Sequence, residues 1–422
     1  MYPTISHLIH DLFNIYIPLP IQTFGFFVAI SFVVGGWIIF KEFKRKEEEG
    51  LLSTVTKKIK VGEGITNYEI FSSIIWGFLI GFKFIEAIFN YDSLVQNPQE
   101  FILSTQGNLI GGILIAAISV YLKWKEKEKD KLEKPEWKEV KVSPHSLVSN
   151  MIMIAAISGV IGAKIFANLE NWDAFINDPW GQLFSFDGLT FYGGLILGAA
   201  AIIYYAKENN IKIPHLIDAF APALILAYGI GRIGCQLSGD GDWGIFNSAY
   251  VVDNFGVMRE AASGEFQYAV QKFGYYFNQN FPEGVPEKYY LKPEYLSFLP
   301  DWLFAYDYPN NVIHHGVPLE NCTNNYCSHL PVPVFPTPLY EIIMTGIIFT
   351  ILWVIRKRIK IAGLLFFIYL TLNGIERFFI EKIRVNIQYD ILGGITQAEI
   401  ISTILILIGL TGSILLLKKK TT

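Results

Sequence analysis

Charged residues are scarce in this chain of 422 residues. Asp, Glu, Lys and Arg make up 17% of it, whereas 52% of the residues are hydrophobic and 15% are aromatic. Soluble domains usually carry about 25% charged residues. The composition, together with a positive mean hydropathy, is typical of a polytopic membrane protein.

Metal-binding motifs are also missing. The seven histidines are scattered and give no ligand spacing such as His-Glu-X-X-His, so we expect neither a metal ion nor a cofactor. Of the three cysteines, Cys235 lies in an apolar span, and Cys322 and Cys327 lie in a long polar region. An oxidising compartment would allow the last two to form a disulfide, but the sequence leaves this pairing open.

The N-terminal region has no lysine or arginine before Lys41. The first apolar span therefore lacks the basic segment of a signal peptide, and it also lacks a small-residue cleavage site. We expect it to be a retained helix.

Nine apolar stretches approach the length that crosses about 30 Å of hydrocarbon, although the third and the fifth are short. We predict an all-α membrane protein with about nine spans. They lie near residues 21–40, 69–89, 107–122, 147–168, 190–206, 216–236, 338–355, 361–380 and 399–417.

Basic residues concentrate in alternate loops, and nine spans place all of these loops on one side. By the positive-inside rule this side is the cytoplasm, which puts the N-terminus outside and the C-terminus inside. The basic loops are Lys41 to Lys60, Lys123 to Lys141, Lys207 with Lys212, Arg356 to Lys360, and Lys418 to Lys420.

The same pattern divides the chain into five segments, of which the fourth is a small domain on the outer side. It is rich in Tyr, Phe, Asn and Pro, and we expect short strands and loops there. The segments are the N-terminal part with the first span (1–66), an extra hairpin with a charged linker (67–146), a membrane core (147–237), the outer domain (238–337) and three C-terminal spans (338–422).

Residues 77–122 and 158–204 share a pattern that indicates a duplicated hairpin. Chance similarity of two apolar hairpins is the alternative. Gly81, Lys83, Tyr91, Asp92, Pro98, Ser104 and Gly107 recur 81 residues later as Gly162, Lys164, Trp172, Asp173, Pro179, Ser185 and Gly188, and Gly111-Gly112 recur as Gly193-Gly194 after one extra residue. Between the copies, acids and bases alternate over 123–141 and nearly cancel, which favours a solvated linker over a surface for nucleic acid or lipid headgroups.

Arg232 lies inside the apolar span 223–237. A guanidinium near the middle of a membrane helix costs about 2.5–3.5 kcal/mol, so it should face an anion or a counter-charge. The neighbouring Gly231 and Gly234 would let a ligand approach the backbone closely. A structural alternative is that Arg232 caps helix carbonyls or pairs with Asp240.

A second charged set follows near the C-terminus. If residues 373–384 are helical, Arg377, Glu381 and Arg384 fall within about 60° of one another and form one stripe. Two arginines with one carboxylate leave a net positive site, which suits a phosphate. The alternative is an ion cluster at the helix end, at the outer interface. We favour a substrate role for Arg377, with Glu381 orienting it.

Four motifs occur in order: Thr-Phe-Tyr-Gly-Gly-Leu-Ile-Leu-Gly (190–198), Gly-Ile-Gly-Arg-Ile-Gly-Cys-Gln-Leu-Ser-Gly (229–239), Pro-Thr-Pro-Leu-Tyr-Glu (336–341) and Arg-Phe-Phe-Ile-Glu-Lys-Ile-Arg (377–384). Through them the chain resembles bacterial prolipoprotein diacylglyceryl transferases. The resemblance implies an enzyme of the bacterial cytoplasmic membrane that moves diacylglyceryl from phosphatidylglycerol to the lipobox cysteine of a prolipoprotein.

The resemblance implies that Arg232 binds the phospholipid and that Arg377, Glu381 and Arg384 match the family's C-terminal signature. With the reading of the residues themselves, we expect a catalytic set of Arg232, Arg377, Tyr192 and Glu381, and a substrate-binding set of Arg232, Gly193, Gly194, Gly234, Asp240 and Arg384. Asp218 stands where the family has an aspartate. Tyr192 replaces a common histidine, Cys235 an asparagine, and Phe24 a tyrosine, so the identity of a general base stays open.

Some assignments have plain structural alternatives. Tyr192 is equally consistent with a packed residue that has no catalytic role. Tyr340 and Glu341 could anchor their span at the membrane interface or contact the prolipoprotein that accepts the lipid. A transporter is the competing function, because duplicated hairpins and glycine-interrupted helices occur there too. A membrane scaffold would leave the cost of Arg232 and Arg377 unexplained.

Overall fold

The computed structural model describes a mainly α-helical chain that divides into two compact units. The first unit comprises Met1–Ile17, Gln22–Glu42 and Ile213–Thr422, and the second comprises Pro18–Ile21 and Phe43–Lys212. The described residues are all of 1–422 except 97, 185–189, 254–256, 320–321, 323–324, 386–387, 390–393 and 422. The predicted matches at Ser185 and Gly188 therefore lie outside the described residues.

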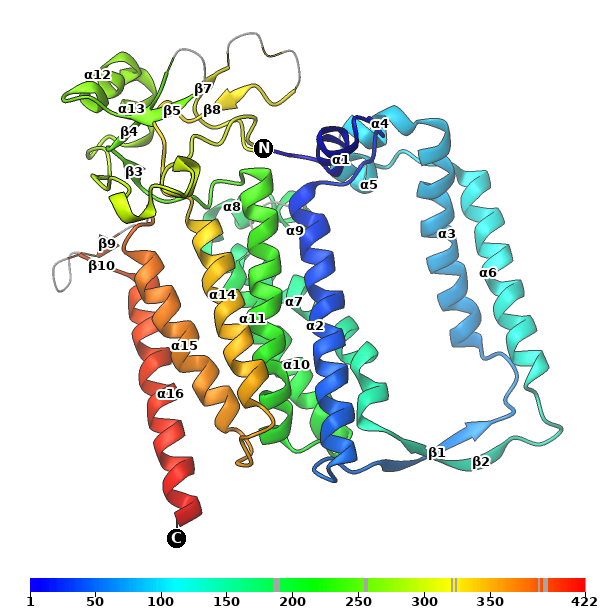
Figure 1. The fold of residues 1–422 in the computed structure, drawn as a ribbon. Coiled ribbons are helices and arrows are strands. Elements are labelled where there is room, and N and C mark those ends of the chain that lie inside the picture. Colours follow the sequence, from blue (N-terminus) through cyan, green and yellow to red (C-terminus); the bar gives the residue numbers. More distant parts are fainter. Residues whose placement is uncertain are drawn as a thin grey trace. The chain divides into compact units, whose positions relative to one another are not determined.

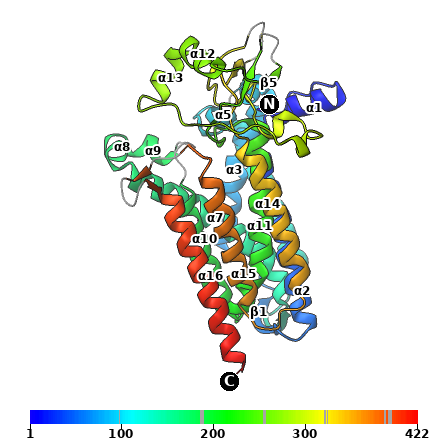
Figure 2. The ribbon, with the colours of Figure 1, turned by 60° about the vertical axis from the view of Figure 1, so that its left-hand side comes forward.

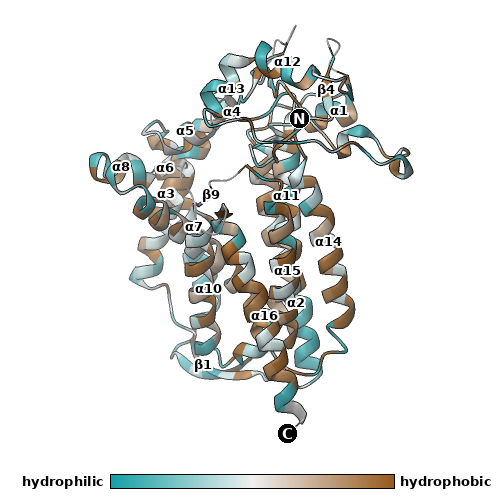
Figure 3. Cartoon of the chain, turned by 90° about the vertical axis from the view of Figure 1, so that its left-hand side faces the viewer, coloured by the Kyte–Doolittle hydropathy of each residue, from teal (hydrophilic) through white to brown (hydrophobic). Residues whose placement is uncertain are grey.

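The first unit is built on long apolar helices that run side by side (Figures 1 and 2). Buried side chains of α11, α14 and α15 form its membrane-region core, namely Ala221, Ile225, Ile348, Leu352 and Leu365. Apolar residues dominate these helices along their length (Figure 3). The helices of this unit are α1 (Ile5–Phe13), α2 (Thr23–Glu48), α11 (Ile213–Ser238), α14 (Thr337–Ile355), α15 (Leu364–Glu381) and α16 (Gln397–Thr421).

Asp218 holds the start of α15. Its carboxylate accepts hydrogen bonds from the backbone N–H groups of Gly363, at 2.8 Å, and Phe366, at 3.1 Å. Gly363 precedes the helix with a φ of +90°, which glycine adopts without strain. A buried carboxylate on α11 thus satisfies donors that a helix N-terminus leaves unpaired, and it fixes the helix that carries Arg377.

Residues 239–336 form a head of short strands, short helices and loops within the first unit. A buried cluster that includes Trp243, Phe246, Phe277 and Tyr308 makes its core, and a disulfide joins Cys322 to Cys327. β3 (Phe246–Asn247) pairs in parallel with β6 (Glu287–Lys288), while β4 (Tyr250–Val252) with β5 (Met258–Glu260) and β7 (Val317–Pro318) with β8 (Ser328–His329) are antiparallel. The helices of the head are α12 (Glu265–Lys272), α13 (Gly274–Asn280), η2 (Glu294–Leu296) and η3 (Asp301–Leu303). Outside the head, after α15, β9 (Gln388–Tyr389) pairs antiparallel with β10 (Ile395–Thr396).

The second unit contains two helical hairpins and one β-ribbon. The ribbon pairs β1 (Val55–Val61) antiparallel with β2 (Glu136–Val142). One hairpin comprises α3 (Asn67–Phe89), α4 (Tyr91–Gln96), α5 (Pro98–Leu103) and α6 (Leu109–Lys129), and the other comprises η1 (Pro144–Leu147), α7 (Val148–Glu170), α8 (Trp172–Asn177), α9 (Pro179–Phe184) and α10 (Phe191–Glu208).

The two hairpins have the same helix order, and α7, α8 and α9 begin and end 81 residues after α3, α4 and α5. Their glycine contacts also correspond. A Cβ on Gly81 would lie 2.5 Å from the carbonyl oxygen of Gly111, and one on Gly162 would lie 2.3 Å from that of Gly193. In both hairpins the shared glycines therefore allow the two long helices to pack backbone against backbone.

Substitution of Gly111 by valine is expected to destabilise the first hairpin by about 1–3 kcal/mol, the usual cost of overpacking. The Cβ alone would lie 2.5 Å from the side chain of Ile85. Ala117→Val on the exposed face of α6 is the matched control. Limited proteolysis of the hairpin in detergent measures the effect, and equal protease resistance of the two variants would contradict this packing role.

Six helices are long and apolar enough to cross a membrane in the described part of the chain. These are Thr23–Glu48, Asn67–Phe89, Pro144–Glu170, Ile213–Ser238, Thr337–Ile355 and Gln397–Lys419. The other three predicted stretches form the helices α6, α10 and α15, which are not among these six. All three helices carry charged residues at their ends, and α10 and α15 have only 18 residues each.

Candidate functional site

Glu341 is the centre of a buried ion cluster in the first unit. It lies in the second turn of α14, and its side chain is fully buried. The Tyr228 hydroxyl donates a hydrogen bond to Glu341 Oε1 at 2.7 Å, and Arg232 Nε lies 2.8 Å from Oε2. Tyr228 and Arg232 are one turn apart on α11, so both reach the same carboxylate.

Two more arginines meet this carboxylate from the C-terminal region. Arg377 Nη1 lies 3.2 Å from Glu341 Oε1, and Arg384 Nη1 lies 3.7 Å from the same atom. Arg377 Nη2 also pairs with Glu381 Oε2 at 3.0 Å, one turn along α15. Glu341 therefore brings together the three arginines that the sequence singled out.

Asp242 is the second carboxylate between these arginines. Its Oδ2 pairs with Arg232 Nη1, and its Oδ1 lies 2.7 Å from Arg384 Nη2. Burial raises the pKa of Asp242, but the guanidinium groups of Arg232 and Arg384 outweigh that effect and lower it to about 2. Asp242 is thus ionised at neutral pH, and its side chain is 36% exposed whereas that of Glu341 is buried.

Turns after α11 place Asp242 against the other elements. Gly239 and Gly241 have φ values of +66° and +97°, which favour glycine over other residues. The Thr337 hydroxyl at the start of α14 then donates to the Asp242 carbonyl at 2.8 Å, and Ile245 N–H donates to Ile383 O at 2.9 Å. The ends of α11, α14 and α15 are therefore linked at the site.

Arg384 does not belong to a helical stripe, which corrects the prediction from the sequence. α15 ends at Glu381, and Arg384 lies beyond it in an isolated bridge with Gly244. The backbone leaves the helix because this segment hydrogen-bonds to the turn after α11. Arg384 still reaches the cluster, but from an extended segment.

The prediction of a net positive site is also wrong for the described cluster. Arg232, Arg377 and Arg384 face the carboxylates of Glu341, Asp242 and Glu381. The prediction counted Glu381 alone, because Glu341 and Asp242 lie outside the segment 373–384 on which it was based. The arginines are held in position by carboxylates and carry no excess charge as a group.

Asp240 is not the partner of Arg232, contrary to the pairing considered from the sequence. Arg232 pairs with Asp242, and Asp240 Oδ1 accepts a hydrogen bond from Asp242 N–H at 3.3 Å. Burial and the nearby Asp242 raise the pKa of Asp240. Asp240 therefore shapes the turn that presents Asp242.

The thiol of Cys235 and the carboxylates of Asp240 and Asp242 offer ligand atoms within 4.8 Å of one another. Asp242 is already paired with two arginines, and their positive charge opposes binding of a cation there. This trio is consequently a poor metal site.

Glycine contacts assign packing roles to the predicted glycines. A Cβ on Gly234 would lie 3.2 Å from the Cα of Phe24, so Gly234 lets α11 approach α2. Gly193 and Gly194 contact the backbone of Gly162 and Gly159 on α7. Tyr192 precedes them on α10, in the second unit, with its ring edge-on to that of Phe191 at a centroid separation of 5.9 Å.

Reasoning from the sequence missed Tyr228, Asp242 and Glu376 and gave Glu341 no role in the cluster. Two signals were present, since Tyr228 is one turn before Arg232 and Glu376 is an acid inside an apolar helix. Glu376 is 1% exposed, and neither of its oxygens has a hydrogen-bond partner among the described residues. It adds a buried carboxyl group beside Arg377.

Apolar spanning helices and a buried arginine–carboxylate cluster at their ends define a membrane protein with a polar site. The family model for prolipoprotein diacylglyceryl transferase matches residues 130–415. The chain therefore belongs to the prolipoprotein diacylglyceryl transferase family.

Curated relatives carry the name phosphatidylglycerol–prolipoprotein diacylglyceryl transferase. One from Oceanobacillus iheyensis is 26% identical over 306 residues, covering 71% of this chain and 80% of the relative. One from Staphylococcus aureus is 28% identical over 264 residues, covering 62% and 71%. One from Leptospira interrogans is 35% identical over 133 residues, and there the chain spans only 41% of the relative's length.

Proposed function

We propose that this chain transfers the diacylglyceryl group of phosphatidylglycerol to the lipobox cysteine thiol of prolipoproteins and releases glycerol phosphate. The observation that carries the proposal is the clamp of Arg232 and Arg384 on the two oxygens of Asp242. Two guanidinium groups that hold a carboxylate can hold two phosphate oxygens in the same way. Family membership supports the same reaction.

The phosphate of the donor lipid takes the place of Asp242 in this proposal. Asp242 is the more exposed of the two central carboxylates, whereas Glu341 stays buried and keeps the arginines in position. Arg384 Nε is buried without a hydrogen-bond partner among the described residues, so this arginine has a donor to spare for a ligand. Asp242 thus marks where the phosphate binds.

The chemical step forms a bond between the thiolate sulfur and the glyceryl carbon and breaks the bond from that carbon to the phosphate oxygen. The electron pair of the broken bond goes to the phosphate, which leaves as glycerol phosphate. Arginines stabilise the charge that develops on this oxygen. A guanidinium group close to the sulfur also raises the fraction of thiolate, which is small for a cysteine with a pKa of about 8.5.

The direct test uses purified protein, phosphatidylglycerol and a lipobox peptide, with the thioether product followed by mass. A product heavier by one diacylglyceryl group, formed together with glycerol phosphate, is the expected result. Lipid movement across vesicles without any thioether would instead favour a transporter.

Tyr192→Phe is expected to lower the transfer rate by on the order of 10- to 100-fold, the cost of one donor to a charged acceptor. We propose that Tyr192 donates a hydrogen bond to the phospholipid and does not act as the base, since a phenol hydroxyl is a good hydrogen-bond donor. Tyr192→His should stay active. A folded Tyr192→Phe protein that binds phosphatidylglycerol but has no activity would make the phenol an essential proton-transfer group.

The proposed placement is the bacterial cytoplasmic membrane, with nine spans, the head outside, the N-terminus outside and the C-terminus in the cytoplasm. The alternate basic loops support it, and so does the disulfide of the head, because disulfides persist in oxidising compartments.

Cysteine labelling in intact cells tests this topology. An impermeant maleimide should modify Tyr275→Cys in the head and spare Glu133→Cys in the loop between the hairpins; both native side chains are exposed. Labelling at position 133 in unbroken cells would overturn the arrangement. Lysed cells are the control, because both positions should then react.

A further inference from the structure

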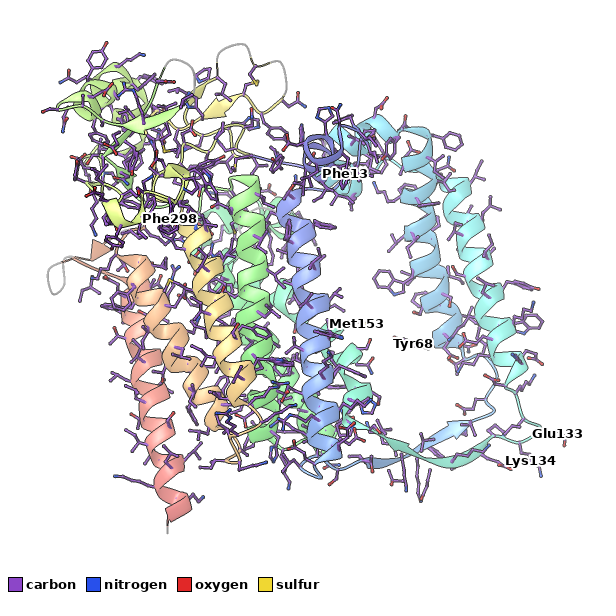
Figure 4. All side chains as sticks on the ribbon, in the orientation of Figure 1. Phe13, Tyr68, Glu133, Lys134, Met153 and Phe298 are labelled. Carbon is purple, nitrogen blue, oxygen red and sulfur yellow. A yellow bond between two sulfur atoms is a disulfide. The ribbon has the colours of Figure 1, made fainter. Side chains whose placement is uncertain are left out.

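Exposed aromatic side chains gather on one segment of the head, which runs from the end of β6 into η3. Tyr289, Tyr295, Phe298 and Trp302, here called the aromatic ridge, are 67%, 78%, 77% and 47% exposed. Figure 4 labels Phe298 close to the upper end of α14. Large apolar side chains gathered on a surface indicate an interaction site.

The backbone under the ridge is held rigidly. Lys292 Nζ donates to Leu299 O at 2.8 Å and pairs with Asp301 Oδ1 at 2.7 Å, and the Tyr250 hydroxyl accepts from Lys292 N–H at 3.1 Å. The ion pair neutralises the charge of Lys292. The segment therefore presents fixed aromatic rings and a net charge of −1, which comes from the exposed Glu294.

A hydrogen bond fixes the position of the ridge relative to a spanning helix. The Tyr340 hydroxyl, near the start of α14, donates to Leu303 O at 2.7 Å, and Leu303 directly follows Trp302. At about 100° per residue, Tyr340 lies within about 20° of Ile347 and Ile351 around the helix. These isoleucines are 56% and 42% exposed, so the ridge lies at the head of an exposed apolar stripe of α14.

We propose that the aromatic ridge inserts into the interfacial layer of the phospholipid bilayer, on the side of the membrane where α14 begins. Tyrosine and tryptophan prefer this layer because each ring has an apolar body and a polar edge. Continuity with the stripe of α14 favours lipid over a protein partner, since one apolar surface runs from the helix onto the head.

The position of the ridge in the bilayer also sets the depth of the Arg232–Arg384 clamp, an inference that rests on the proposed function. Thr337, one turn before Tyr340, holds the carbonyl of Asp242. The ridge and the Arg232–Arg384 clamp are therefore fixed to the same first turn of α14. Seating the ridge places the clamp at the depth of lipid headgroups, where the phosphate of the donor lies.

The experiment places an environment-sensitive fluorophore on Phe298→Cys in the full-length protein. The protein is reconstituted in phosphatidylcholine vesicles that contain lipids with a spin label near the headgroup. Tyr275→Cys, on α13 and 85% exposed, is the matched control on the head, and Ile347→Cys checks insertion of α14. Tyr295→Cys replaces Phe298→Cys if that variant does not fold.

We expect the label at position 298 to be quenched by the shallow spin label and to emit at shorter wavelength than the label at 275. Adding phosphatidylglycerol should not strengthen this quenching, because the ridge segment carries one net negative charge and so does not attract anionic lipid. Equal quenching at 298 and 275, with Ile347 quenched, would overturn the proposal. A label at 298 that is shielded from aqueous iodide yet not quenched by lipid would indicate a protein partner and would also overturn it.

Because quenching requires no turnover, its failure is distinct from failure of the proposed transfer reaction. A variant with serine at positions 295, 298 and 302 links the two. If the ridge sets the depth of the clamp, this variant should lose transfer from vesicle phospholipid while keeping transfer from phospholipid in detergent micelles.

Discussion

Replacing Arg232 with lysine is expected to reduce diacylglyceryl transfer by on the order of 100-fold or more, and alanine should be at least as damaging. The guanidinium divides its contacts between two carboxylates, with Nε on Glu341 and Nη1 on Asp242. An ammonium has its three donors on one nitrogen, so it cannot reach the buried carboxylate through one atom and bind the phosphate through another as the guanidinium does. Initial rates of thioether formation at saturating peptide, with folding checked by size-exclusion chromatography, measure the loss.

Asp242→Asn leaves Arg232 and Arg384 in place and removes only the carboxylate charge that competes with the phosphate for them. The amide keeps the shape of the side chain but removes the charge that we propose the phosphate displaces. Its KM for phosphatidylglycerol should fall or stay the same, in contrast to Arg232→Lys and to Arg377→Ala, which we expect to lose nearly all activity. Wild-type rates in Arg232→Lys would argue against recognition of phosphate through a two-point fork.

The helices and the importance of Arg232 could be predicted from the sequence because both follow from the free energy of placing a short stretch of the chain in a membrane. A long apolar stretch has few alternatives to a membrane helix, and a charge inside one needs a counter-charge. All nine predicted stretches are helical, and Arg232 is paired on both sides of its guanidinium. Neither inference needed knowledge of which helices pack together.

The partners of Arg232 could not be predicted because they depend on the path of the chain outside the helices. Glu341 comes more than 100 positions later in sequence, and it meets Arg232 only because α11 and α14 pack closely at Gly229, where a Cβ would lie 2.4 Å from Thr345 Oγ1. Asp242 is near in sequence, but two glycines with positive φ decide that it, and not Asp240, faces the arginine.

The error at Arg384 has the same origin. Helical spacing placed it with Arg377 and Glu381, whereas α15 ends at Glu381 because the following backbone bonds to the turn after α11. Spacing on one helix is informative only as far as the helix extends, and tertiary hydrogen bonds decide where it ends.

Glu341→Gln is expected to destabilise the folded protein by about 3–5 kcal/mol, the usual cost of removing one partner from a buried ion pair, and to abolish transfer. Glutamine keeps the volume and can still accept from Tyr228, but it leaves Arg232, Arg377 and Arg384 facing a neutral amide. Thermal unfolding in detergent, followed by circular dichroism, measures the loss of stability.

Glu381→Gln is the matched control, because Glu381 contacts only Arg377 of the three arginines in the ion pairs described above. It should cost less stability than Glu341→Gln.

Added glycerol phosphate should raise the unfolding temperature of Glu341→Gln more than that of the wild type, since an anion can replace the missing charge among the three guanidinium groups. If Glu341→Gln unfolds at the wild-type temperature and retains activity, then Glu341 does not organise the arginines, and the proposed clamp depends on Asp242 alone.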